Sequence, residues 1–169
     1  THAWELWKSD GTASGTVMVK DINPTSSSTP TQLTAVGNTL YFSANDGTHA
    51  WELWKSDGTA SGTVMVKDIG PSGSEGTAYA RHSFIAVGNT LYFNADDGTN
   101  GLELWKSDGT ASGTVMVKDI NIGSDDSMLP GSWDRFTRAA IGNTLYFMAN
   151  DGNHGYELWK SDGTASGTM

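Results

Sequence analysis

One phrase of twelve residues, ELWKSDGTASGT, occurs four times in this chain without a change. The copies begin at Glu5, Glu52, Glu103 and Glu157, so the steps between them are 47, 51 and 54 residues. A period of this length is typical of one propeller blade or one solenoid turn, in which each unit buries its apolar surface only against its neighbours. The fold is therefore deduced for one repeat and then extended along the chain.

The charge balance and the lack of cysteine narrow the possible partners. The 169 residues include 19 acidic and 10 basic side chains, which give a net charge of -9. This charge repels nucleic acid and anionic lipid, so we expect neither as a partner. No apolar run approaches the roughly 20 residues of a membrane span, and we expect no membrane insertion. Without cysteine there is neither a disulfide nor a thiolate metal site.

The second period shows what one repeat folds into. Its β-prone runs predict four short strands, over residues 33–36, 39–44, 51–55 and 64–69. Gly, Asn and Asp residues between these runs supply the backbone conformations that tight hairpins need. No stretch has helical periodicity over ten or more residues. We therefore predict an all-β chain in which each unit is an antiparallel meander.

Apolar residues fall on both sides of the predicted strands. Leu40 and Phe42 alternate with Tyr41, and Leu53 stands next to Trp54. A sheet that is apolar on both sides needs cover on both sides. The pattern favours four-stranded blades of the β-propeller type, packed face to face, with a β-solenoid as the alternative.

Numbering the strands within a blade divides the chain into four units. We expect a partial blade with strands three and four at 1–22, whole blades at 23–69 and 70–120, and a partial blade with strands one to three at 121–169. Such an array leaves blade faces open. Three arrangements would cover them: a longer propeller of which this is a segment, a ring built from several copies, or an open-ended assembly. Other copies or further repeats of the same protein are the expected partners.

The repeated phrase also carries a family resemblance. Residues 52–59, ELWKSDGT, and their three copies resemble the bacterial repeat family named for its ELWxxDGT motif. The resemblance implies a propeller-like protein that is extracellular or at the cell surface. Two weaker similarities point to the same fold: residues 37–41 are similar to a kelch strand, and Ser56-Asp57-Gly58 to the Asp-box turn of sialidase blades.

Of the four connections in each repeat, two are unchanged and two differ, and a meander places the two that differ at one end of the blades. These are the connections 23–31, 70–83 and 121–138 and the shorter turns 45–50, 96–101 and 150–155. Binding residues are often carried on variable loops of a rigid scaffold, although neutral drift also leaves loops variable. If the chain binds a ligand, we expect the ligand at this end.

Calcium is the first candidate ligand, and the only cofactor considered. Hard oxygen donors gather in these loops, and the candidate ligands are Asp46, Asp96, Asp97, Asp125, Asp126 and Asp151. The competing interpretation is that Asp-Gly forms a good turn by itself, and it is favoured. Asp57 of the repeated phrase has the same two interpretations, and we expect its carboxylate to accept N–H bonds within the turn.

Surface glycans are the second candidate, because aromatic and polar side chains that suit a sugar lie near the same loops. The candidates are His49, Trp51, Arg81, His82, Trp133, Arg135, His154 and Tyr156. The competing interpretation is that Trp51 and its counterparts fill space between blades. Trp54 and its three copies are interpreted as core, and Glu52 and Lys67 as a cross-strand ion pair.

Catalysis has little support in the sequence, since the acids are turn residues and no nucleophile has a neighbouring base. We therefore expect a noncatalytic extracellular scaffold for structural assembly, adhesion or recognition. A lectin-like module that binds carbohydrate or calcium is one alternative. A sialidase-like glycoside hydrolase is the other, and its arginines would be Arg81, Arg135 and Arg138.

Overall fold

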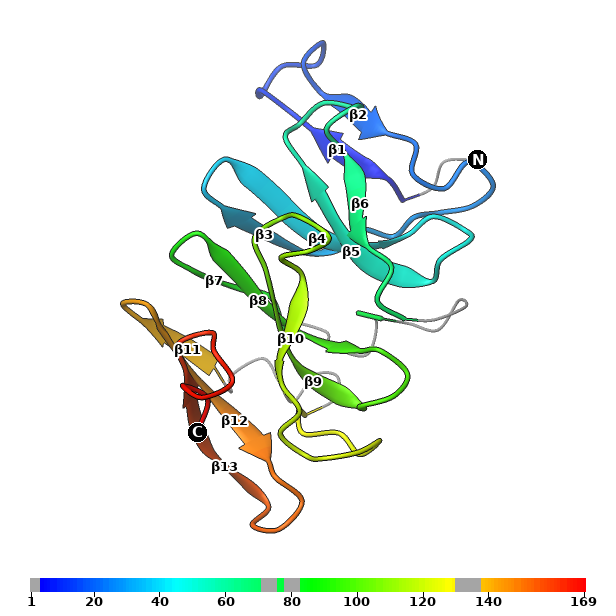
Figure 1. Cartoon of the computed structure of the whole chain (residues 1–169). Coiled ribbons are helices and arrows are strands. Elements are labelled where there is room, and N and C mark those ends of the chain that lie inside the picture. Colours follow the sequence, from blue (N-terminus) through cyan, green and yellow to red (C-terminus); the bar gives the residue numbers. More distant parts are fainter. Residues whose placement is uncertain (1–3, 71–75, 78–82, 130–137) are drawn as a thin grey trace.

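The computed structural model describes residues 4–70, 76–77, 83–129 and 138–169, and these fold entirely into strands and turns (Figure 1). No helix occurs among them, so the all-β prediction is confirmed. The strands are β1 (Leu6–Lys8), β2 (Val17–Lys20), β3 (Thr31–Val36), β4 (Thr39–Asn45), β5 (Trp51–Ser56), β6 (Val64–Lys67), β7 (Ile85–Val87), β8 (Thr90–Asp96), β9 (Leu102–Ser107), β10 (Val115–Lys118), β11 (Arg138–Ile141), β12 (Thr144–Asn150) and β13 (Tyr156–Ser161).

The strands form four antiparallel sheets in which each strand pairs with its neighbours in sequence. The sheets are β1-β2, β3-β4-β5-β6, β7-β8-β9-β10 and β11-β12-β13. The predicted four-stranded meander is thus confirmed for both central repeats. Figure 1 shows the sheets following one another from the N-terminal to the C-terminal end. In the described part of the chain the last sheet does not pair with the first, so the set is not closed.

Successive sheets pack face to face, and the core lies between them. Phe42 of the second sheet packs towards the first, with Leu6 and Trp54, whereas Leu53 packs towards the third, with Phe93. Phe42 and Leu53 are both 0% exposed. A third apolar cluster joins the third and fourth sheets. Both faces of each central sheet are therefore covered, as the apolar pattern predicts.

The repeated turn after β5 is held by its own side chains. Asp57 Oδ1 accepts hydrogen bonds from the backbone N–H of Thr59, at 2.9 Å, and from its hydroxyl, at 2.7 Å. Gly58 has a positive φ of 87°, which a side chain would strain. The same aspartate bonds recur in the other three copies. The turn interpretation of Asp57 is confirmed.

A buried glutamate fixes the connection that leaves each of the first three sheets. Glu52 is 0% exposed, and its carboxylate accepts the backbone N–H groups of Ile69, at 2.9 Å, and Gly70, at 3.0 Å. Glu103 accepts those of Ile120 and Asn121 in the same way. Since these N–H groups would otherwise be buried without partners, the carboxylate satisfies them.

Candidate functional site

The interface between adjacent sheets is the most regular feature of the molecule. Lys55 lies on the third strand of its sheet, and its Nζ donates a hydrogen bond at 2.8 Å to the carbonyl oxygen of Gly109, in the turn of the next sheet. The same contact occurs at the same distance between Lys8 and Gly58 and between Lys106 and Gly163. The same lysine-to-glycine contact therefore recurs at three successive interfaces.

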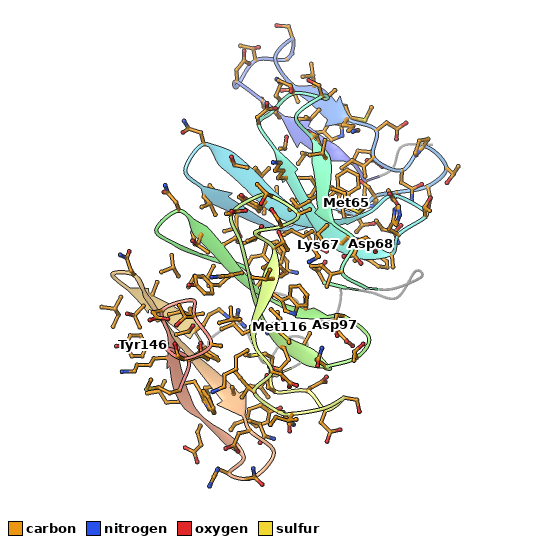
Figure 2. The ribbon with its side chains drawn as sticks, in the orientation of Figure 1. Met65, Lys67, Asp68, Asp97, Met116 and Tyr146 are labelled. Atoms are coloured by element: carbon orange, nitrogen blue, oxygen red, sulfur yellow. The ribbon has the colours of Figure 1, made fainter. Side chains whose placement is uncertain are left out.

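A second lysine, on the fourth strand, reaches across each interface. Lys67 Nζ donates to the carbonyl oxygen of Thr114 at 2.8 Å and lies 5.5 Å from the ring centre of Trp105. Lys20 and Lys118 make the equivalent pairs of contacts. Figure 2 labels Lys67 beside Met65 on β6. The predicted ion pair between Glu52 and Lys67 is wrong: the glutamate binds its own connection, and the lysine binds the next sheet.

A tyrosine on the second strand closes the interface around the turn glycine. The Tyr41 hydroxyl lies against Gly109 so closely that a Cβ atom there would collide with it, and Tyr92 meets Gly163 in the same way. Gly11 and Gly58 have open space instead, with nothing within 4 Å of a Cβ. Gly58 faces the first sheet, which has only two strands and no second-strand tyrosine.

The repeated tryptophans show which faces are covered. Trp54 and Trp105 are each only 6% exposed, so their interpretation as core is confirmed. Trp7 has the same sequence neighbours but is 56% exposed, because no sheet lies in front of β1 in the described chain. The copies have the same sequence neighbours, but each tryptophan is buried or exposed according to whether another sheet of the array covers it.

The opposite end of the array is exposed on its other face. Leu158 of β13 is 74% exposed, although its counterparts Leu53 and Leu104 are 0% exposed. Beside it lies an open depression of about 200 Å³, lined by Tyr146, Leu158, Trp159, Lys160 and Met169. The described chain thus ends in two different apolar faces, one at each end.

Among the described residues, two buried glutamates are the acids whose pKa is raised most. Burial raises the pKa of both Glu52 and Glu103 to about 7, and the hydrogen bonds they accept oppose this shift. A raised carboxyl pKa is common in active sites. Here, however, each side chain is 0% exposed, so a substrate cannot reach it. Their chemistry is that of a structural anchor.

The two histidines predicted to bind sugar lie in equivalent turns of different sheets. His49 Nδ1 is 2.9 Å from Asp46 Oδ2, and His154 Nδ1 is 2.8 Å from Asp151 Oδ2. In the turn of the sheet between them, Asn100 Nδ2 donates to Asp97 Oδ2 at 2.8 Å. Either a histidine or an asparagine at this position thus bonds to the aspartate of its turn. His49 and His154 belong to different sheets, and the structure does not bring them together in one site.

The other predicted sugar-binding residues are dispersed or lie elsewhere. Trp51 is half-buried at the start of β5, where its carbonyl oxygen accepts the N–H of Thr77, and Tyr156 is 39% exposed at the start of β13. Arg138, considered for a hydrolase, donates to Ser83 and Asn94 within the fold. Four candidates lie outside the described residues: Arg81, His82, Trp133 and Arg135.

The predicted calcium ligands are engaged in turns. Asp46, Asp97 and Asp151 each accept two backbone N–H groups of their own turn. Asp96 accepts the N–H of Gly98, and Asp126 that of Leu102. The backbone of Asp125 lies against Gly101. Over the ranges that the structure describes, no three carboxylate or imidazole groups are placed to hold a metal ion together.

Comparison with known proteins adds no relative. No family model, no curated protein and no solved structure matches this chain. Among the described residues there is also no helix of the length and apolar character needed to cross a membrane.

Proposed function

We propose that this chain is a noncatalytic scaffold of β-propeller-type blades, whose function is structural assembly outside the cell. The observation that carries the proposal is the lysine-to-glycine contact repeated at three successive interfaces. A repeated interface of this kind makes stability a sum over neighbouring units, which is the property of an extendable array.

The arrangement of the sheets supports propeller-type blades over a solenoid. The first strand of each sheet contacts the first strand of the next, since β3 touches β7 and β7 touches β11. Contact between the first strands of consecutive four-stranded sheets is typical of blades arranged around an axis. The described turns 45–50, 96–101 and 150–155 each join the second and third strands of a sheet, so in such blades they lie at the same end.

The extracellular location rests on the resemblance of residues 52–59 to the ELWxxDGT repeats. Protease treatment of intact source cells tests it: a displayed chain is digested, whereas a chain that survives until the cells are lysed contradicts this part of the proposal.

Lysine substitutions test the scaffold itself. The changes Lys55→Met and Lys106→Met each remove one interface bond and keep the apolar stem, so each is expected to cost about 1 kcal/mol of unfolding free energy. Lys8→Met should cost less, because its bond is exposed to solvent. The matched control is Lys160→Met, since the Lys160 Nζ has no hydrogen bond within the described chain. If all four variants unfold like the wild type, these contacts do not build the array and the proposal fails.

A further inference from the structure

The two exposed ends of the array are complementary to each other. The head face is defined here by Trp7, Gly11 and Thr16, around β1 and β2, and the tail face by Tyr146, Leu158, Lys160 and Met169, around β12 and β13. We propose that the tail face of one copy of this chain binds the head face of a second copy. This inference rests on the proposed function, because it takes the internal interface as its template.

The internal interfaces show what each face binds. The side corresponding to the tail presents Tyr41, Leu53 and Lys55, and it is covered by the side corresponding to the head, with Trp105 and Gly109. The interface between the third and fourth sheets repeats these contacts through Tyr92, Leu104 and Lys106. The two ends present the same groups without the covering sheet.

Exposure identifies the groups that lack their counterparts. Leu158 is 74% exposed against 0% for Leu53, and Trp7 is 56% exposed against 6% for Trp54. Thr16 is exposed, whereas its counterpart Thr63 is 0% exposed. Tyr146 lies on the last sheet, at the far end of the row from the N-terminus (Figure 2). Exposed apolar surface of this kind, rimmed by polar groups, marks an interaction surface.

Placing a second copy as the next sheet supplies the missing counterparts of the second-strand and third-strand groups, whereas the fourth-strand lysine has none because the last sheet has three strands. Lys160 Nζ would donate to the carbonyl oxygen of Gly11, as Lys106 does to that of Gly163. Tyr146 would cover Gly11, which now has nothing within 4 Å of a Cβ. Leu158 and the depression of about 200 Å³ beside it would receive Trp7. The head sheet supplies strands three and four of the covering blade, which carry these groups.

Strand edges do not offer the same match. Two third strands lack a neighbour that their counterparts have: β1 has no second strand beside it, and on the outer side of β13 Met169 exchanges two backbone hydrogen bonds with Lys160 in place of a full fourth strand. In the central sheets a third strand pairs with a second and a fourth strand and never with another third strand. Docking of the two faces therefore follows a contact that already occurs between sheets within the chain, whereas pairing of the two edge strands follows none.

Because the two faces differ, the contact is heterologous, and each bound copy leaves one face of each kind free. Such contacts end in a ring if the rotation closes and continue as a filament if it does not. Two copies of the four-sheet chain fall within the roughly four to eight blades of propellers, so a closed dimer is the smallest ring expected.

Two variants that each block one face give a direct test. In Leu158→Glu the tail face is blocked, and in Trp7→Glu the head face is blocked. Both side chains are exposed, so the fold should tolerate the changes. Light-scattering mass at about 150 mM salt, where screening limits repulsion between copies of charge -9, should show multiples of 17.9 kDa for the wild type. Each variant alone should give one chain, and their equimolar mixture a one-to-one complex.

Controls separate this contact from general stickiness. Ile122 is 88% exposed in the connection between the third and fourth sheets and is not among the residues that define either face, so Ile122→Glu should keep the wild-type mass. Lys160→Met should weaken association about tenfold, as expected for one charged hydrogen bond. In dilute solution, where both proteins are monomeric, the two melting temperatures should agree.

The inference is overturned if the wild type stays monomeric at about millimolar concentration, or if the mixture of blocked variants stays monomeric. It is also overturned if Trp7→Glu alone dimerises, since the contact would then join two tail faces. Amide exchange separates these results from a failure of the scaffold. A monomer with protected β4, β5, β8 and β9 overturns only the docking, whereas loss of protection in those strands overturns the proposed function as well.

Discussion

The hydroxyl of Tyr41 fills the space that a side chain on Gly109 would need, although the two residues belong to different sheets. A side chain at Gly109 is therefore disfavoured for two reasons, the positive φ of 88° and the tyrosine that occupies the space. Gly58, with a φ of 87°, has only the first reason. Two identical sequence positions therefore differ in their tolerance to change.

Alanine substitutions measure this difference. Gly58→Ala should cost about 1 kcal/mol of unfolding free energy from backbone strain alone. Gly109→Ala should cost about 2 kcal/mol more, because the tyrosine has to move. Urea unfolding of both variants checks the prediction, and adding Tyr41→Phe should recover part of the loss at Gly109. Equal losses for the two glycines would contradict the contact.

Stability should fall as pH rises through neutrality. Burial raises the pKa of Glu52 and Glu103 to about 7, above the 4.5 of an exposed glutamate. Below about pH 4.5 both carboxyls are protonated in the folded and unfolded chains, and their contribution is fully present. It is lost as pH rises through 7, because the folded chain must then hold a buried charge. The loss is on the order of 3 kcal/mol for each group.

Urea unfolding between pH 5 and pH 8 measures this loss. Glu103→Gln keeps a neutral side chain of the same shape and should remove about half of the pH dependence. Glu157→Gln is the matched control, since Glu157 is the copy of this residue that lies exposed. A pH dependence that is identical in all three proteins would show that these carboxyls are not its source.

The turn histidine should be replaceable by asparagine. The hydrogen bond to Asp46 raises the pKa of His49, so the stability it adds is present below pH 6.5 and is lost as pH rises through the raised value. Asn100 makes the same bond without titrating. His49→Asn should therefore keep the wild-type melting temperature at pH 8 and lose the contribution at pH 6, whereas His49→Ala should be less stable at both. Equal melting of the alanine and asparagine variants at pH 8 would contradict the shared role.

Calcium should not change the stability of the chain. The carboxylates of Asp46, Asp97 and Asp151 already accept N–H groups in their own turns. Melting temperatures measured with about 5 mM calcium and with a chelator should agree, because a bound ion would add stability through mass action. A clear increase with calcium would restore the candidate metal site at these loops.

Local sequence was sufficient to predict the sheets, because strands and turns depend on neighbouring residues. The predicted strand at 39–44 is observed as Thr39–Asn45, and that at 51–55 as Trp51–Ser56. The strand predicted at 64–69 ends earlier, at Lys67. Its end follows from a distant residue, since Glu52 takes the N–H of Ile69 out of the ladder.

Contacts between repeats could not be predicted in this way. Charged residues are almost always exposed unless paired, so Glu52 and Lys67 were expected to pair at the surface. Their partners are instead backbone groups, and that of Lys67 lies 47 residues away. Every residue carries the same backbone groups, so the sequence does not indicate which of them a side chain will bind. The available signal was the unchanged glutamate, which stands between two apolar or aromatic residues in all four copies.

The lysine of each interface binds a main-chain carbonyl oxygen, at Gly58, Gly109 or Gly163. Mutation can remove the donor, but no substitution removes the acceptor. A repeat copied by gene duplication therefore carries both the lysine donor and the carbonyl acceptor of the interface, and no compensating change is needed in the repeat beside it. The array can lengthen or shorten in a single genetic step, and each added repeat keeps the contact that joins it to its neighbour.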